Sequence, residues 1–131
     1  MNQLIRFFPK AGKAWTKDRC LPGGDFSSRE ALSHKIIDQY PWLSPLLLKR
    51  YLRQYGLLCE HILRDKQSLS ELGRDFGCDM YQSEVDYLIE KEWARSLNDI
   101  IWRRTKHGLR LNDEQKAVLN LYIKSKTCQL P

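Results

Sequence analysis

The sequence predicts an all-α fold, a small multi-helix domain preceded by an extended N-terminal arm. No stretch of strand length alternates Val, Ile or Thr with polar residues, as a half-buried β-strand would. Residues typical of helix N-termini recur along the chain, and the apolar residues that follow them repeat at helical spacing. With 131 residues, 42% of them hydrophobic, the chain is long enough to bury one core of its own.

Helix start and stop signals divide the first half of the chain. Ser27 and Glu30 have the spacing of a capping box, which predicts a helix over residues 27–39. Ser44-Pro45 combines an N-cap serine with a proline at the first helical position. The helix that begins there should stop at Gly56, since glycine is the residue most often found just past a helix C-terminus.

Shorter and later elements follow the same logic. We expect short helical pieces over residues 57–63 and 68–73. A last helix should begin at Asn112-Asp113-Glu114. The helix dipole favours the lysines near its C-terminus. Residues 1–26 have no helical periodicity and contain Leu21-Pro22-Gly23-Gly24, which is typical of a turn or an extended arm.

A helix predicted over residues 81–93 places an acid on its apolar stripe. Val85, Leu88, Ile89 and Glu92 recur at helical spacing, and a carboxylate is unusual in such a stripe. Residues 79–92 carry a net charge of −4.

The next predicted helix has the opposite charge. Ser96 and Asp99 form a second capping box, with aspartate in place of glutamate. Arg104 shares a face with the apolar residues that follow the box, and residues 95–110 carry a net charge of +4. We therefore expect a partly buried Glu92–Arg104 salt bridge, in which loss of one partner costs roughly 3–5 kcal/mol if the pair is well desolvated.

Metal sites and common catalytic motifs find no support in the sequence. Cys20, Cys59, Cys78 and Cys128 form no CxxC pair, and the three histidines have no ligand spacing. We expect four unpaired thiols. The sequence contains no GxGxxG, Walker, HExxH or GxSxG motif.

The net charge of +6 suggests polyanionic partners, but its distribution weakens that suggestion. Residues 1–24 carry four of the six charges. Residues 103–107 are one candidate phosphate site, although an ion network between the two oppositely charged helices is the preferred interpretation. Lys49, Arg50 and Arg53 would suit an anionic membrane face, although a solvated helix face is preferred. No apolar run is long enough to span a bilayer, and the N-terminus lacks a signal-peptide core.

DNA binding is the strongest rival on physical grounds. Residues 68–77 are similar to the first helix and turn of a helix-turn-helix motif. The next helix would then be the recognition helix, but it is strongly acidic, with Glu84, Asp86, Glu90 and Glu92. Phosphates would repel it. We therefore expect no nucleic-acid partner.

Two sequence boxes resemble one known family. The segments AWTKDRCLPGG (residues 14–24) and EVDYLIEKEWARSLNDIIWRRTKHGL (residues 84–109) closely resemble the C-terminal helical domain of the aerobic, FAD-dependent glycerol-3-phosphate dehydrogenases. Between them, YPWL, a helix that ends in YG, and LGRDFG are similar in order to the family pattern. The resemblance covers nearly the whole chain.

This resemblance implies a domain without its own catalytic site. In that family a larger N-terminal portion holds FAD, and the full-length parent oxidises glycerol 3-phosphate to dihydroxyacetone phosphate and reduces membrane quinone. We expect this chain, alone, to have no cofactor-binding, metal or catalytic residue, and to be an excised or separately produced domain. Its partner would be the N-terminal FAD-binding portion, and the cytoplasmic membrane surface is a second candidate. The parent would be cytoplasmic and peripheral to the inner membrane face.

The same resemblance divides the chain into two parts. Residues 1–26 would be an interdomain connector arm, and residues 27–131 the C-terminal helical, cap-like domain. Candidate docking residues are Trp15, Lys17, Trp102, Arg103 and Lys106, whereas Glu92 and Arg104 are assigned to folding. The residues of Leu21-Pro22-Gly23-Gly24 would lie against the missing portion. The alternative is a free-standing helical interaction adaptor or nucleic-acid-binding domain.

Overall fold

A computed structural model describes residue 7 and residues 16–128 and confirms the all-α prediction over that part of the chain. No strand forms among these residues, where a single antiparallel bridge joins Asp75 to Tyr81. The α-helices are α1 (Arg29–Gln39), α2 (Pro45–Tyr55), α3 (Cys59–Leu63), α4 (Gln82–Glu90) and α5 (Asp113–Thr127). A short 3-10 helix at Thr16–Asp18 precedes them, and between them lie 3-10 helices at Gly56–Leu58, Leu69–Leu72 and His107–Leu109 and a π-helix at Asp99–Arg104.

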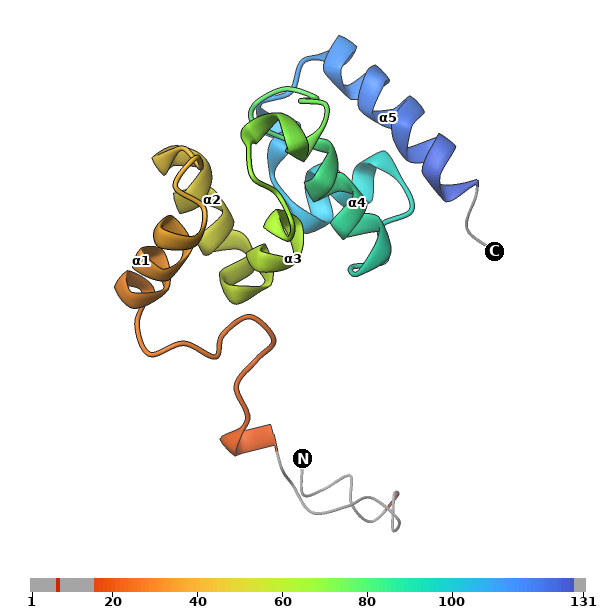
Figure 1. Cartoon of the computed structure of the whole chain (residues 1–131). Coiled ribbons are helices and arrows are strands. Elements are labelled where there is room, and N and C mark those ends of the chain that lie inside the picture. The colour runs from red at the N-terminus through yellow and green to blue at the C-terminus, as the bar shows by residue number, and fades with distance from the viewer. Residues whose placement is uncertain (1–6, 8–15, 129–131) are drawn as a thin grey trace.

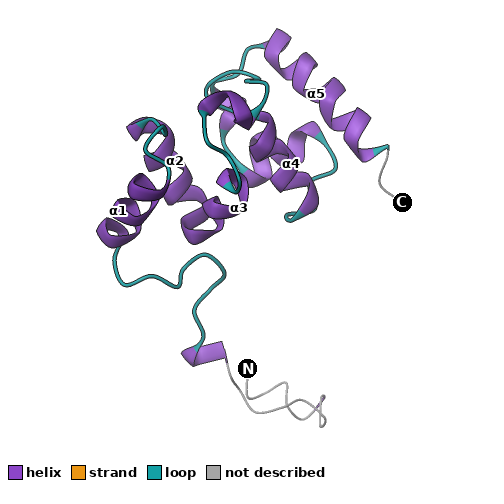
Figure 2. Cartoon of the chain, viewed as in Figure 1, coloured by secondary structure: helices purple, strands orange, loops and turns teal. Residues whose placement is uncertain are grey.

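The helices enclose one core. Figure 1 shows α1 and α2 side by side, α3 beside α4, and α5 along the far edge of α4. In Figure 2 teal loops join these helices, and residues 19–28 form a loop that contacts the helical body at Gly23. The fully buried side chains come from elements distant in sequence and include Ile36, Tyr51, Leu63, Leu72, Leu88, Ile100 and Leu119.

The predicted start of α1 is wrong by one residue. Ser28, rather than Ser27, has an extended backbone, and its hydroxyl accepts a hydrogen bond from the Ala31 amide at 3.1 Å. Two adjacent serines offer the same hydroxyl, so the local sequence alone could not choose between them. The predicted end at Gln39 is confirmed.

Helix α2 has the predicted boundaries. The Ser44 hydroxyl accepts from the Leu47 amide at 3.3 Å, and Pro45 occupies the first helical position. The helix ends at Gly56, whose φ of +55° suits glycine better than any other residue.

Helix α4 is shorter than predicted, because it ends at Glu90 and not at Trp93. Trp93 has a φ of +56°, and the Ala94 amide donates to the Leu88 carbonyl, so the chain reverses direction at this point. The acid predicted to lie on the buried stripe, Glu92, therefore lies beyond the helix.

The segment after this reversal is a π-helix, where the sequence predicted an α-helix. The Thr105 amide and hydroxyl both donate to the Ile100 carbonyl, five residues earlier. The predicted capping box is present, because Ser96 and Asp99 exchange backbone and side-chain hydrogen bonds at 2.9 and 3.2 Å. Nothing in the local sequence signals the wider helix, and π-helical turns are frequent at functional sites.

Helix α5 packs on α4 through a few specific contacts. Asn112 and Gln115 form a complete capping box at its start. The Tyr122 hydroxyl donates to the Asp86 carboxylate at 2.6 Å, and its ring packs against Phe76.

Part of the N-terminal arm packs on its own domain. The Gly23 carbonyl accepts from the Leu57 amide at 3.0 Å, where α2 passes into the next turn. A β-carbon on Gly56 would lie 2.2 Å from that carbonyl oxygen. Gly23 therefore packs against Gly56 of its own domain, and contact of the Leu21-Pro22-Gly23-Gly24 turn with an N-terminal portion stays a prediction.

This close approach predicts a steep cost for any side chain at Gly56. The change Gly56→Ala combines a strained positive φ with the clash against Gly23, so the free energy of unfolding should fall by about 1–3 kcal/mol. Chemical denaturation of the purified chain measures it. Gly24→Ala is the matched control, because its β-carbon would lie 3.2 Å from the Leu21 carbonyl in an exposed turn. Equal losses in the two variants would contradict a tight contact between Gly23 and Gly56.

Candidate functional site

An ion pair that the sequence did not predict lies at the centre of the domain. Arg50 of α2 donates from both terminal nitrogens to the two carboxylate oxygens of Glu84 in α4, at 2.6 and 2.7 Å. The Glu84 side chain is fully buried and that of Arg50 is 15% exposed. Arg50 also donates to the Asp79 carbonyl at 2.7 Å. A bidentate geometry of this kind fixes both side chains and joins α2 to α4.

Aromatic and imidazole groups surround this pair. The Tyr55 hydroxyl donates to Glu84 at 2.6 Å, and burial beside that carboxylate strongly raises the pKa of Tyr55. Burial also lowers the pKa of His107, which lies in the 3-10 turn His107–Leu109. Nε2 of His107, Nε of Arg50 and the Tyr51 hydroxyl are buried and make no hydrogen bond within the described structure. We name Arg50, Tyr51, Tyr55, Glu84 and His107 the buried polar cluster.

Sequence reasoning missed the cluster, although one signal was present. Glu84 lies four residues before Leu88, so it belongs to the same apolar stripe in which Glu92 attracted attention. The periodicity could identify Glu84 as a buried acid. It could not identify Arg50, which is 34 residues away in sequence and looks like part of a solvated basic face.

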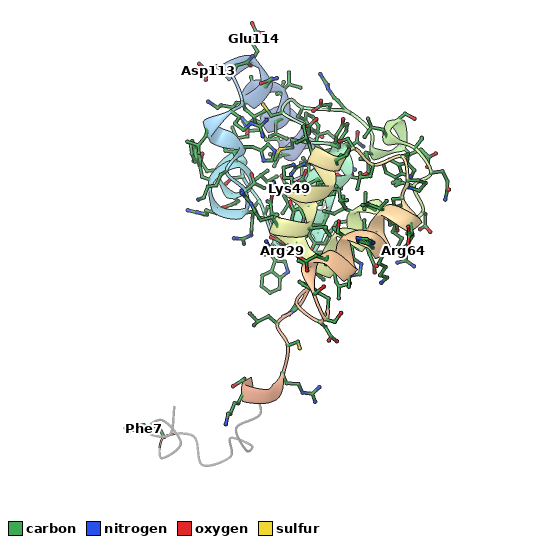
Figure 3. The ribbon with its side chains drawn as sticks, turned by 90° about the vertical axis from the view of Figure 1, so that its left-hand side faces the viewer. Phe7, Arg29, Lys49, Arg64, Asp113 and Glu114 are labelled. Carbon is green, nitrogen blue, oxygen red and sulfur yellow. The ribbon has the colours of Figure 1, made fainter. Side chains whose placement is uncertain are left out.

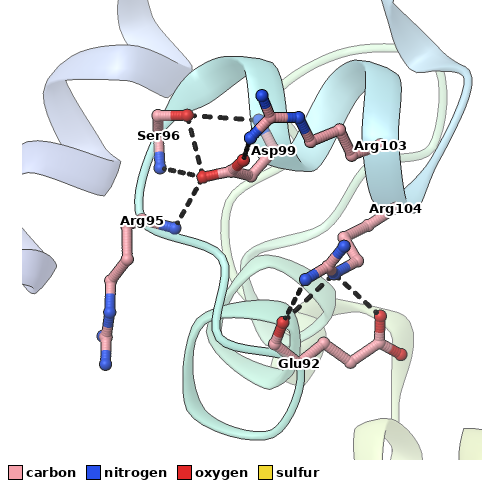
Figure 4. A network of polar contacts seen from close by, with 6 residues as sticks. All are labelled: Glu92, Arg95, Ser96, Asp99, Arg103 and Arg104. Atoms are coloured by element: carbon pink, nitrogen blue, oxygen red, sulfur yellow. Dashed lines mark hydrogen bonds and ion pairs between the residues drawn. The ribbon is translucent and has the colours of Figure 1, made fainter.

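The predicted Glu92–Arg104 pair forms with a different geometry from the one expected (Figure 4). Arg104 Nε lies 3.7 Å from a Glu92 carboxylate oxygen, whereas the shorter contacts, at 3.1 and 2.9 Å, go to the Glu92 backbone carbonyl. Both side chains are about one-third exposed, at 29% for Glu92 and 35% for Arg104. Burial raises the pKa of Glu92, and Arg104 opposes that rise. The contact therefore has the character of a surface pair, for which contributions of about 0.2–1 kcal/mol are usual.

Three of the predicted docking residues lie on the π-helix Asp99–Arg104 or just after it (Figure 4 shows the start of this helix). Trp102 is 41% exposed, and its indole packs on Gly108, where a β-carbon would lie 2.5 Å from the ring. Lys106 donates to the Trp102 carbonyl at 2.7 Å. Arg103 pairs with Asp99, whose pKa is lowered to about 2 by hydrogen bonds from Arg95 and Ser96, Arg103 adding to them.

The other two docking candidates lie on the N-terminal arm. Lys17 is exposed in the short helix Thr16–Asp18, and Trp15 lies outside the described residues. Trp102, Arg103 and Lys106 are thus neighbours on or just after the π-helix, and no contact within the described residues joins Lys17 to them. A docking role for all five residues stays a prediction.

The described part of the chain contains side chains of the types that bind metal ions or act as reactive thiols. Histidine, cysteine and carboxylate side chains form no group of three that would suit a metal ion there. All four cysteines are unpaired, as predicted, and burial raises the pKa of Cys59 to about 12. No helix within residues 16–128 has both the length and the apolar character to cross a bilayer.

Removal of one member of the buried ion pair should be costly. Glu84→Gln and Arg50→Met each leave a desolvated group without its partner, so each should lower the free energy of unfolding by roughly 3–5 kcal/mol. In a double-mutant cycle measured by denaturation, the two effects should couple by about 1–3 kcal/mol.

The exposed pair Lys116–Asp113 is the matched control, because its aspartate is fully solvated. Its cycle should give less than about 1 kcal/mol. Additive effects of Glu84→Gln and Arg50→Met would show that the contact is not an energetic link between α2 and α4.

Comparison with known proteins places the chain in a family. The model of the C-terminal domain of alpha-glycerophosphate oxidase matches residues 14–124. The chain is 40% identical to D-erythritol 1-phosphate dehydrogenase of Brucella abortus over 89% of its length, and 35% identical to aerobic glycerol-3-phosphate dehydrogenase of Escherichia coli over 98%. It is 40% identical to glycerol-3-phosphate dehydrogenase of Pseudomonas aeruginosa over 95%. The chain spans about a quarter of the length of these curated relatives, 24%, 26% and 25% respectively. It belongs to the family of alpha-glycerophosphate oxidase C-terminal domains.

Proposed function

We propose that this chain is the C-terminal domain of a respiratory flavoprotein that oxidises glycerol 3-phosphate to dihydroxyacetone phosphate. The family match over residues 14–124 carries the proposal. In the proposed parent, the secondary alcohol of the substrate would be oxidised by loss of two hydrogens, FAD would supply the redox chemistry for this, and quinone would be the final electron acceptor. FAD and the substrate would be held by a larger N-terminal portion.

The domain itself would stabilise and dock, and would not carry out the chemistry. Its polar residues with the tightest contacts, Arg50, Glu84 and Tyr55, bind one another in the interior and are not free to bind a substrate. The exposed indole of Trp102 on a π-helix supports a docking surface there, since tryptophan and arginine are enriched at protein interfaces. We propose the N-terminal FAD-binding portion as the partner, in a cytoplasmic enzyme peripheral to the inner membrane face.

The alternative of a free-standing adaptor or nucleic-acid binder has weaker support. Helix α4, which would have to enter a DNA groove, contributes Val85, Leu88 and Ile89 to the core. Its exposed acid Glu90 would face the phosphates with the wrong charge.

A chimera tests the proposal. In the Escherichia coli relative, the stretch that aligns with this chain is replaced by this chain, and flavin content and glycerol 3-phosphate-dependent reduction of a quinone analogue are measured. We expect the chimera to bind flavin and turn over, and the enzyme truncated before that stretch to fail. D-erythritol 1-phosphate, tested as a second substrate, shows whether the rate of the chimera depends on the length of the polyol.

Two further variants test docking. Trp102→Ala together with Arg103→Ala should lower the quinone-analogue reduction by the chimera, while the isolated variant chain keeps its helical circular dichroism. Leu121→Ala on α5, where the leucine is 69% exposed, is the matched control and should leave activity unchanged. The proposal fails if the chimera behaves like the truncated enzyme although the isolated chain folds, or if the isolated chain oxidises glycerol 3-phosphate.

A further inference from the structure

A basic pocket lies beside α2 and the turn that follows His107–Leu109. It has a volume of about 280 Å³ and is lined by Leu46, Lys49, Arg50, Arg53, Asp79 and Arg110. Figure 3 shows Lys49 on the face of α2 turned toward the viewer. Arg110 reaches the same pocket from the turn that follows His107–Leu109, so two distant segments supply its cations.

Three cations of this pocket have no carboxylate partner, unlike several other cations of the described structure. Lys35, Arg64, Arg103, Arg104, Lys116 and Lys126 each have a carboxylate within ion-pair distance. Within the described residues, Lys49, Arg53 and Arg110 have no such partner. Lys49 and Arg53 are also four residues apart on one helix, a spacing at which like charges destabilise.

The charge of the pocket matches a dianion. Arg50 is neutralised by Glu84 beneath it and holds the Asp79 backbone in place. Of the three remaining cations, Asp79 offsets one, so the pocket keeps a net charge of +2. A phosphate monoester carries about −1.5 to −2 charges at pH 7, and guanidinium groups match phosphate oxygens in a forked geometry.

We propose that this pocket binds a phosphate group, with Lys49, Arg53 and Arg110 as its ligands. The inference rests on the three cations without a carboxylate partner and on Arg50, which Glu84 holds in place. It does not depend on the function proposed above. Two sources would supply the same chemistry, a soluble phosphate monoester or a phospholipid headgroup. The second is included because Lys49 and Arg53 also border an apolar hollow of about 430 Å³ between α1 and α2, which contains Ile37, Leu48 and Leu52.

Titration of the isolated 131-residue chain tests the site. Inorganic phosphate and glycerol 3-phosphate are added at constant ionic strength, with chloride as the reference, and amide chemical shifts are followed by NMR. We expect saturable shifts at Lys49, Arg53 and Arg110. Loss of one charged hydrogen bond should raise the dissociation constant about tenfold in Lys49→Gln and in Arg110→Gln.

Lys124→Gln is the matched control, because Lys124 is exposed on α5 and has no ion pair in the described structure. It should leave the dissociation constant within about twofold. Circular dichroism of each variant establishes that it is folded. Lys49→Arg, which keeps the positive charge, should retain phosphate binding.

Vesicles distinguish the two sources. Co-sedimentation of the chain is measured with phosphatidylglycerol vesicles and, for comparison, with phosphatidylcholine vesicles. A phospholipid headgroup is identified if the chain sediments with the phosphatidylglycerol vesicles alone, and if Arg110→Gln abolishes this binding while Lys124→Gln keeps it. Binding of soluble phosphate alone would identify a monoester. The proposal is overturned if chloride gives the same shifts, if Lys124→Gln weakens binding as much as Arg110→Gln, or if neither source binds.

Discussion

The contact between Arg50 and Glu84 is the constraint on which the rest of the domain depends. It contains the one fully desolvated carboxylate of the described structure, and it joins α2 to α4 through two short hydrogen bonds. Tyr55 completes its shell from the end of α2, and Arg50 also fixes the Asp79 loop. A buried ion pair of this kind adds little net stability over an apolar pair of the same shape, but it penalises every arrangement that separates its partners. Its main effect is therefore on which packing of α2 and α4 is allowed.

Local signals in the sequence were sufficient for the elements that short-range chemistry determines. Ser44, Pro45 and Gly56 set the bounds of α2 through a cap, a fixed φ and a positive φ, all of which act within a few residues. The Ser96–Asp99 capping box was predicted for the same reason. The family match likewise agrees with the resemblance carried by residues 14–24 and 84–109.

Interactions between distant residues explain what the sequence did not reveal. Helix α4 stops at Glu90 because the chain reverses through Trp93, and the backbone there is held by the Ala94–Leu88 hydrogen bond. This reversal puts Glu92 outside the helix, so Arg104 meets its carbonyl more closely than its carboxylate. Arg50 lies among basic residues on a helix whose exposed face looks solvated, and only the fold brings Glu84 to it. Of the net charge of +6, which first suggested a polyanionic partner, four units lie in residues 1–24, and the α2 pocket is a separate local concentration of cations.

Native-state hydrogen exchange tests the central role of the Arg50–Glu84 link most directly. In the wild-type chain, the slowest amides of α2 and α4 should exchange through one shared opening, with equal free energies and equal dependence on denaturant. If α4 instead opens at a distinctly lower free energy while α2 stays protected, the ion pair does not hold the two helices together as a unit.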